Sequence, residues 1–121
     1  MKSIVTGGAG FIGSHLVDKL LDMGHEVVVL DNFSTGRKEN LSHVDGKIKL
    51  IECNLSIKGS WIKEFNKVDW VFHLASLADI VPSIQNPEEY FRSNVDATFY
   101  VLEAARHANV KRFIYSASSS C

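Results

Sequence analysis

Four glycines in the segment Thr-Gly-Gly-Ala-Gly-Phe-Ile-Gly, residues 6–13, have the spacing that brings a backbone close to a phosphate. The segment follows a short apolar run at residues 2–5 and precedes an amphipathic stretch at residues 14–23. Such glycines allow a sharp turn out of a strand, a close approach to phosphate and tight packing of the next helix. The free N–H groups and the positive end of that helix then face an anion. The spacing therefore predicts a site for the pyrophosphate of a dinucleotide.

An acidic residue follows the glycine segment at the distance that such sites require. Residues 26–30 form a near-continuous apolar run, which predicts a buried parallel strand that ends at Asp31. Asp31 follows the turn by about twenty residues, where a carboxylate accepts the hydroxyls of the cofactor's ribose. Because a carboxylate repels a 2′-phosphate, Asp31 favours NAD over NADP. Arg37 and Lys38 come soon after and could attract that phosphate, but we interpret them as part of a solvated loop.

The composition predicts one soluble globular domain. The chain has 121 residues, of which 45% are hydrophobic, and a net charge of −1. This charge gives no electrostatic basis for a nucleic-acid or membrane partner, and no apolar run reaches the ~18 residues that span a bilayer. The N-terminal residues do not form a signal peptide, so we expect the protein in the cytoplasm.

The cysteines and histidines do not predict a metal site or a disulfide framework. Two cysteines and five histidines are scattered along the chain without ligand spacing. His73 ends a buried apolar run, and we interpret it as structural rather than as a catalytic base. His25, in contrast, is expected to be exposed.

The order of the expected elements predicts an α/β fold with a doubly wound parallel sheet of about five strands. Ligands bind such sheets outside the carboxyl ends of the strands, where the glycine segment and Asp31 fall. Strands are expected at residues 2–6, 26–31, 48–52, 70–74 and 112–116, and helices at residues 13–23, around 61–65 and at 87–108, with a polar loop over residues 32–46.

These motifs together resemble the extended short-chain dehydrogenase/reductases, specifically the NAD-dependent nucleotide-sugar epimerases and dehydratases (UDP-galactose 4-epimerase-like proteins). The resemblance covers the whole chain and the N-terminal part of the family. It implies an incomplete Rossmann fold, with residues 1–121 as a truncated NAD-binding domain. The matching blocks are residues 6–13, Asp-Asn-Phe-Ser-Thr-Gly at 31–36, Val-Phe-His-Leu-Ala at 71–75, Val-Pro-Ser at 81–83, Pro-Glu-Glu-Tyr at 87–90, Asn-Val at 94–95, Leu-Glu-Ala-Ala-Arg at 102–106 and Arg-Phe-Ile-Tyr-Ser-Ala-Ser at 112–118.

The resemblance also implies roles for individual residues. Ser118 is expected to hydrogen-bond the sugar hydroxyl that is oxidised, and Ser83, Ser118 and Ser120 are expected near the sugar. The family usually has an aspartate at position 54, which accepts from the adenine amino group; Asn54 is expected to accept through its carbonyl instead. The residues expected to bind the cofactor are Gly7, Gly10, Phe11, Ile12, Gly13, Asp31, Asn32, Ser34, Gly36, Asn54, Leu55, Leu74, Ala75, Ser76, Asn94 and Ser116.

The family's catalytic Tyr-x-x-x-Lys pair does not occur in this chain. The residues four positions after Tyr90, Tyr100 and Tyr115 are asparagine, alanine and serine. The resemblance implies that the pair comes after residue 121, so this chain is expected to be the NAD-binding portion of an epimerase and inactive alone. The reaction implied takes a hydride from sugar C4 and returns it. A 4,6-dehydratase, a related dehydrogenase and a non-catalytic NAD(P)-sensing module remain alternatives.

Two of the expected elements bear on association. Apolar residues occur on more than one face of the expected helix at 87–108, and the resemblance implies that the second face forms a homodimer. Residues 112–116 are expected to form an exposed edge strand. We therefore expect the chain to self-associate.

Overall fold

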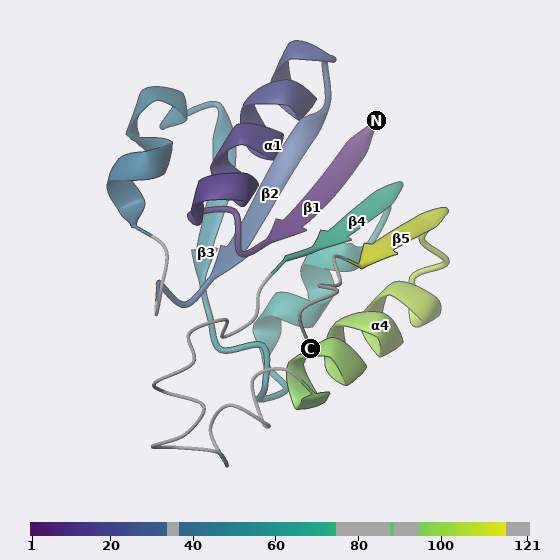
Figure 1. Ribbon diagram of the computed structural model, residues 1–121. Helices are drawn as coiled ribbons and strands as arrows, with labels where there is room; N and C mark the ends of the chain where they lie inside the picture. The colour runs from purple at the N-terminus through teal and green to yellow at the C-terminus, as the bar shows by residue number, and fades with distance from the viewer. Residues whose placement is uncertain (34–36, 75–87, 89–94, 116–121) are drawn as a thin grey trace.

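A five-stranded parallel sheet forms the centre of the protein (Figure 1). The computed structural model describes residues 1–33, 37–74, 88 and 95–115. The strand order is β3-β2-β1-β4-β5, and every neighbouring pair is parallel. This order confirms the predicted doubly wound sheet. The strands are β1 (Lys2–Thr6), β2 (Glu26–Asp31), β3 (Ile48–Glu52), β4 (Trp70–His73) and β5 (Arg112–Tyr115).

Helices cover both faces of this sheet. Helix α1 (Phe11–Asp22) contacts β1, β2 and the 3-10 helix η1 (Lys38–Val44). Helix α4 (Ala97–His107) contacts β4 and the 3-10 helix η2 (Ser60–Phe65). In Figure 1, α1 and η1 lie on one side of the sheet and α4 and η2 on the other. No helix among the described residues is long and apolar enough to cross a bilayer.

The two faces have separate hydrophobic cores, which explains why β2 is apolar at successive positions. Successive side chains of a strand point to opposite faces. Val27 and Val29 pack with α1 in one core, whereas Val28 and Leu30 pack with Phe65 in the other. All four of these β2 residues are at most 2% exposed, as the predicted buried strand requires.

Most strand predictions match, but one loop prediction is wrong. The ranges of β1, β2 and β3 are those expected, β4 ends at His73 rather than residue 74, and Ser116 lies outside the described residues. The segment expected as a loop over 32–46 contains η1. Leu41 and Val44 are its buried residues, and their spacing of three matches the turn of a 3-10 helix, so burial organises this otherwise polar segment.

The other helical predictions differ mainly in extent. Helix α1 begins at Phe11, two residues earlier than expected. The segment around 61–65 is helical but has 3-10 geometry. Of the helix expected over residues 87–108, the structure describes α4, and residues 89–94 lie outside the described residues.

His25 is buried, contrary to the sequence-based expectation. The residue is 7% exposed, and its Nδ1 lies 2.7 Å from the Ser3 hydroxyl. The ring also packs against Trp70, with the centroids 5.0 Å apart. His25 directly precedes β2, and the strand register places Ser3 of β1 and Trp70 of β4 opposite each other, so both residues cover the ring.

Candidate functional site

The glycine turn fits closely between β1 and α1. Gly7 has a positive φ of 72°, and its carbonyl accepts a hydrogen bond from the Gly10 N–H at 3.1 Å. A Cβ atom on Gly13 would contact the Gly7 carbonyl oxygen and would lie 2.8 Å from the Gly8 Cα. Because both neighbours are backbone atoms, they cannot move aside as a flexible side chain could. Only glycine lets α1 start this close to the turn.

The N-terminus of α1 is left free to bind an anion. Its N-cap residue is Gly10, which has no side chain to accept from the helix, and the first turn contains no acidic residue. The first internal bond runs from the Ser14 N–H to the Gly10 carbonyl at 2.9 Å. The N–H groups of Phe11, Ile12 and Gly13 precede it and need a partner outside the helix. Donors and a helix dipole therefore converge at the turn, as a pyrophosphate requires.

The carboxylate of Asp31 is held against the same turn. Its Oδ2 accepts from the Ala9 N–H at 2.9 Å, and its Oδ1 accepts from the Phe33 N–H at 2.8 Å. Asp31 is 6% exposed. A carboxylate oxygen can accept more than one hydrogen bond, so each oxygen can also accept from a hydroxyl. The site thus combines N–H donors for a pyrophosphate with an acceptor for a ribose, and it fits a dinucleotide.

A second segment supports the turn, and sequence analysis did not identify it. The Ala9 carbonyl accepts from the Asn40 side-chain amide at 2.7 Å and from the Arg37 N–H at 3.1 Å. The Lys38 ammonium lies 5.2 Å from the centroid of the Phe33 ring. A hydrogen bond to a backbone carbonyl leaves no pattern in the sequence. The contact of Asn40 with the turn therefore could not be predicted from the sequence.

Asn54 follows β3, and its side chain accepts hydrogen bonds from a nearby serine. Its carbonyl oxygen Oδ1 accepts from the Ser56 N–H at 3.0 Å and from the Ser56 hydroxyl at 2.6 Å. A side-chain amide oxygen has two lone pairs, and Ser56 takes both. That this carbonyl accepts from an adenine amino group stays a prediction, and such a contact would have to share or replace a bond from Ser56.

Cys53 is a protonated thiol rather than a nucleophile. Burial, and then the negative charge of Asp31, raise the pKa of Cys53 to about 11. Its backbone N–H donates to the Asp31 carbonyl at 3.0 Å, which fixes the chain between β3 and Asn54 beside the end of β2.

A buried histidine links three elements below the site. His73 is 1% exposed, with Nδ1 2.7 Å from the Thr6 hydroxyl and Nε2 2.9 Å from the Thr98 hydroxyl. The Thr6 hydroxyl also accepts from the Leu74 N–H at 3.0 Å. Burial lowers the pKa of His73 to about 4, so the ring is neutral at pH 7. These contacts agree with the structural interpretation of His73.

The predicted site residues that the structure describes gather at one edge of the sheet. The turn follows β1, and Asp31 ends β2. Leu74 follows β4, and Asn54 follows β3. Leu55, next to Asn54, is buried, and Asn32, directly after β2, is exposed. The remaining predicted site residues lie outside the described residues: Ser34, Gly36, Ala75, Ser76, Ser83, Asn94, Ser116, Ser118 and Ser120.

Comparison with known proteins agrees with this arrangement. The model of the NAD-dependent epimerase/dehydratase family matches residues 3–121. UDP-glucuronic acid decarboxylase 1 of Arabidopsis thaliana is 40% identical over 98% of this chain and 26% of its own length. UDP-glucose 4-epimerase of Erwinia amylovora is 38% identical over 99% of this chain and 37% of its own length.

A solved structure shows the same fold. The UDP-glucose 4-epimerase of Thermus thermophilus, in complex with NAD, superposes with a TM-score of 0.83 at 37% identity, covering 93% of this chain and 36% of that one. The chain therefore spans between about a quarter and two fifths of the length of these relatives. Because the family model matches nearly the whole chain, this chain belongs to the NAD-dependent epimerase/dehydratase family.

Proposed function

We propose that this chain is the NAD-binding portion of a nucleotide-sugar epimerase. The observation that carries the proposal is the uncapped start of α1, directly beside a buried carboxylate that is bonded to the same turn. The relative from Erwinia amylovora, named UDP-glucose 4-epimerase, favours this reaction class. The decarboxylase from Arabidopsis thaliana keeps a related reaction on a nucleotide sugar as the second candidate.

Different residues of the site would bind different parts of the cofactor. The N–H groups of Phe11, Ile12 and Gly13 would hold the pyrophosphate, and Asp31 would accept the ribose hydroxyls. The backbone of Leu74, fixed by Thr6, would line the cofactor on the β4 side. NAD, when bound, supplies an acceptor for a hydride from the sugar. Ser118 is proposed to bind the sugar hydroxyl, and Ser83 and Ser120 to lie near the sugar.

Cofactor binding tests the proposal. Titrated by calorimetry, NAD is expected to bind the chain at least about tenfold more tightly than NADP, because the Asp31 carboxylate repels a 2′-phosphate at close range. In the same samples a UDP-sugar with NAD is expected to stay unconverted, since the chain has no Tyr-x-x-x-Lys pair. Equal or tighter binding of NADP would assign Arg37 and Lys38 the role of phosphate ligands and overturn the preference for NAD.

We also propose that the chain forms a homodimer through α4. One face of this helix is buried through Ala97, Val101, Ala104 and Ala105. Val95, Phe99 and Leu102 form an exposed apolar stripe, with 47%, 57% and 46% of each residue accessible. Their spacing places them on one side of a helix, and exposed apolar groups of this size mark interaction surfaces.

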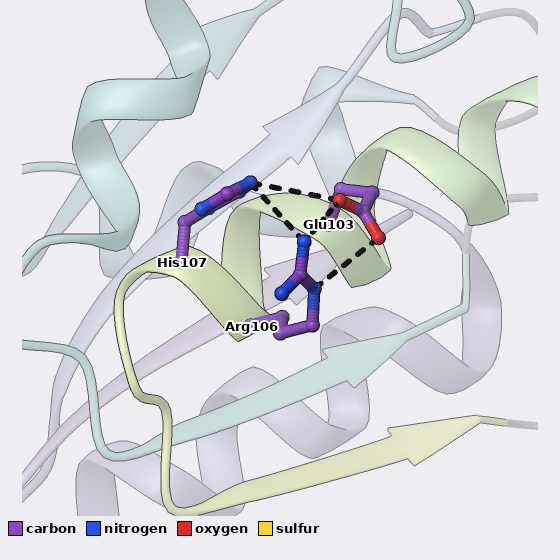
Figure 2. A network of polar contacts seen from close by, with 3 residues as sticks. All are labelled: Glu103, Arg106 and His107. Carbon is purple, nitrogen blue, oxygen red and sulfur yellow. Dashed lines mark hydrogen bonds and ion pairs between the residues drawn. The ribbon is translucent and has the colours of Figure 1, made fainter.

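A polar group bounds the C-terminal end of the apolar stripe. Figure 2 shows the side chains of Arg106 and His107 directed toward the Glu103 carboxylate. The Arg106 Nη2 lies 2.9 Å from this carboxylate and the His107 Nε2 lies 3.6 Å from it. The hydrogen bond from Arg106 holds the pKa of Glu103 below its ordinary value. In a two-fold pair, each stripe would contact the partner's stripe.

Substitution within the apolar stripe tests the homodimer. Sedimentation equilibrium is expected to show a dimer for the wild-type chain, and Phe99→Glu is expected to weaken it at least about tenfold by burying a charge. Met23→Glu is the matched control, because Met23 is similarly exposed, at 54%, and ends α1 on the opposite side of the sheet from α4. A wild-type monomer at ~100 µM, far above the Kd expected for a stable interface, would overturn the proposal. Equal weakening of the dimer by the two substitutions would also overturn the proposal.

A further inference from the structure

We propose that Asn40 is a positioning residue for the glycine turn, which it holds in the orientation that a pyrophosphate needs. Asn40 belongs to η1 and is exposed, so it is not part of a hydrophobic core. Its effect on the turn is a property of the chain itself. Its effect on cofactor binding rests on the proposed function, because it assumes that the turn binds a dinucleotide.

The bond from Asn40 fixes a peptide group in the middle of the turn. The Ala9 carbonyl accepts from the Asn40 Nδ2 at 2.7 Å and from the Arg37 N–H at 3.1 Å. In a planar trans peptide the carbonyl and the following N–H point in opposite directions. The direction of the Ala9 carbonyl therefore sets the direction of the Gly10 N–H, which donates to the Gly7 carbonyl at 3.1 Å.

Gly10 connects this peptide group to the anion-binding end of α1. It is the N-cap residue of the helix, and its own carbonyl accepts the first helical bond, from the Ser14 N–H at 2.9 Å. A rotation of the peptide between Ala9 and Gly10 would tilt the first turn of α1, and with it the N–H groups that would hold a pyrophosphate. Asp31 holds the preceding peptide group through the Ala9 N–H. The turn is thus bonded to both β2 and η1.

The packing of η1 keeps Asn40 beside the turn. Leu41 and Val44 are at most 5% exposed and belong to the hydrophobic core on the α1 side of the sheet. The His43 Nε2 lies 2.7 Å from the Asp18 Oδ1 of α1. In Figure 1, η1 lies beside α1, and the two helices are in contact. Because η1 is attached to α1 in this way, Asn40 links the turn to the helix that follows it.

Substitutions of Asn40 test this role in the whole chain. Only the nitrogen of an amide can donate to a carbonyl, so Asn40→Leu removes the donor at similar size, whereas Asn40→Asp places a carboxylate oxygen against the Ala9 carbonyl. In calorimetry, NAD is expected to bind about fivefold more weakly to Asn40→Leu, the loss of one typical hydrogen bond, and at least about tenfold more weakly to Asn40→Asp.

Ser42→Asp is the matched control for the added charge. Ser42 is an exposed residue of the same helix, and its hydroxyl donates to the Glu39 carbonyl rather than to the turn. The affinity of Ser42→Asp for NAD is expected to stay within about twofold of the wild type, because a charge at the surface is screened by solvent.

Amide hydrogen exchange in the ligand-free protein separates positioning from direct contact with the cofactor. A positioning role predicts that the N–H groups of Ala9 and Gly10 exchange about tenfold faster in Asn40→Asp than in the wild type, because the turn opens more often. The methyl NMR signals of Leu41 and Val44 are expected to keep their positions, since η1 remains packed on α1.

The outcomes that would overturn the inference differ from those that concern the proposed function. Unchanged affinity in both Asn40 variants would overturn it, as would an equal loss in Ser42→Asp, which would assign the effect to charge. A lower affinity with unchanged exchange at the turn would make Asn40 a direct ligand instead. Displaced Leu41 and Val44 signals would show that Asn40 only stabilises η1. If NAD did not bind the wild type, the proposed function and the effect on binding would fail together, and the exchange rates would still decide whether Asn40 positions the turn.

Discussion

Gly13→Ala is expected to abolish dinucleotide binding and to lower the free energy of unfolding by roughly 3 kcal/mol, the upper part of the range for overpacking a close contact. The added methyl group would contact the Gly7 carbonyl oxygen and approach the Gly8 Cα, both of which belong to the turn itself. Helix α1 would have to move away from the turn. Its N–H groups would then leave the position in which they can hold a pyrophosphate. Calorimetry with NAD and chemical denaturation measure the two effects.

Two other glycines provide matched controls. A Cβ at Gly10 would meet only the Gly7 carbonyl oxygen, at 3.4 Å, so Gly10→Ala is expected to fold normally but to bind NAD weakly, because the methyl group stands where phosphate approaches. Gly24 has a φ of 84° and open space around it. Gly24→Ala is expected to cost about 1 kcal/mol of backbone strain and leave binding intact. Wild-type affinity for NAD in Gly13→Ala would contradict the proposed role of the turn.

The sheet could be predicted from the sequence because each strand has a strong local signal. The strand β2 is apolar at successive positions since it is buried on both faces, and its end at Asp31 was predicted to the residue. The helix η1 was missed because only Leu41 and Val44 are buried in a polar segment. Two apolar residues three apart are too weak a pattern to distinguish a 3-10 helix from a loop.

The candidate site was predictable in its parts but not in its hydrogen bonding. The glycine turn and Asp31 were recognised from their spacing. That the Asp31 carboxylate is bonded to the Ala9 N–H, in the turn itself, depends on how two neighbouring strands are aligned. The state of Asn54 depends on Ser56, two residues later. An asparagine with serine at this spacing is typical of a local side-chain turn, so this signal could have been used.

Acid is expected to destabilise the protein through His73. The pKa of His73 is about 4 in the folded protein, lowered by burial from 6.5. Between pH 6.5 and 4 the unfolded chain binds a proton at this residue and the folded chain does not. The contribution of His73 to stability is therefore complete above pH 6.5 and is lost as the pH falls toward 4. A shift of this size corresponds to about 3 kcal/mol over the whole interval.

Comparison with His73→Gln isolates this contribution. The free energy of unfolding, measured by chemical denaturation between pH 7 and pH 4.5, is expected to fall more steeply in the wild type than in the variant, because carboxylates titrate in both. Gln can bond to either the Thr6 or the Thr98 hydroxyl, so part of the link between β1, β4 and α4 is kept. Titration of the His73 ring by NMR gives the same answer without a variant. A ring that titrates near 6.5, or equal pH slopes for both proteins, would show that His73 is hydrated in solution and does not hold Thr6 in place.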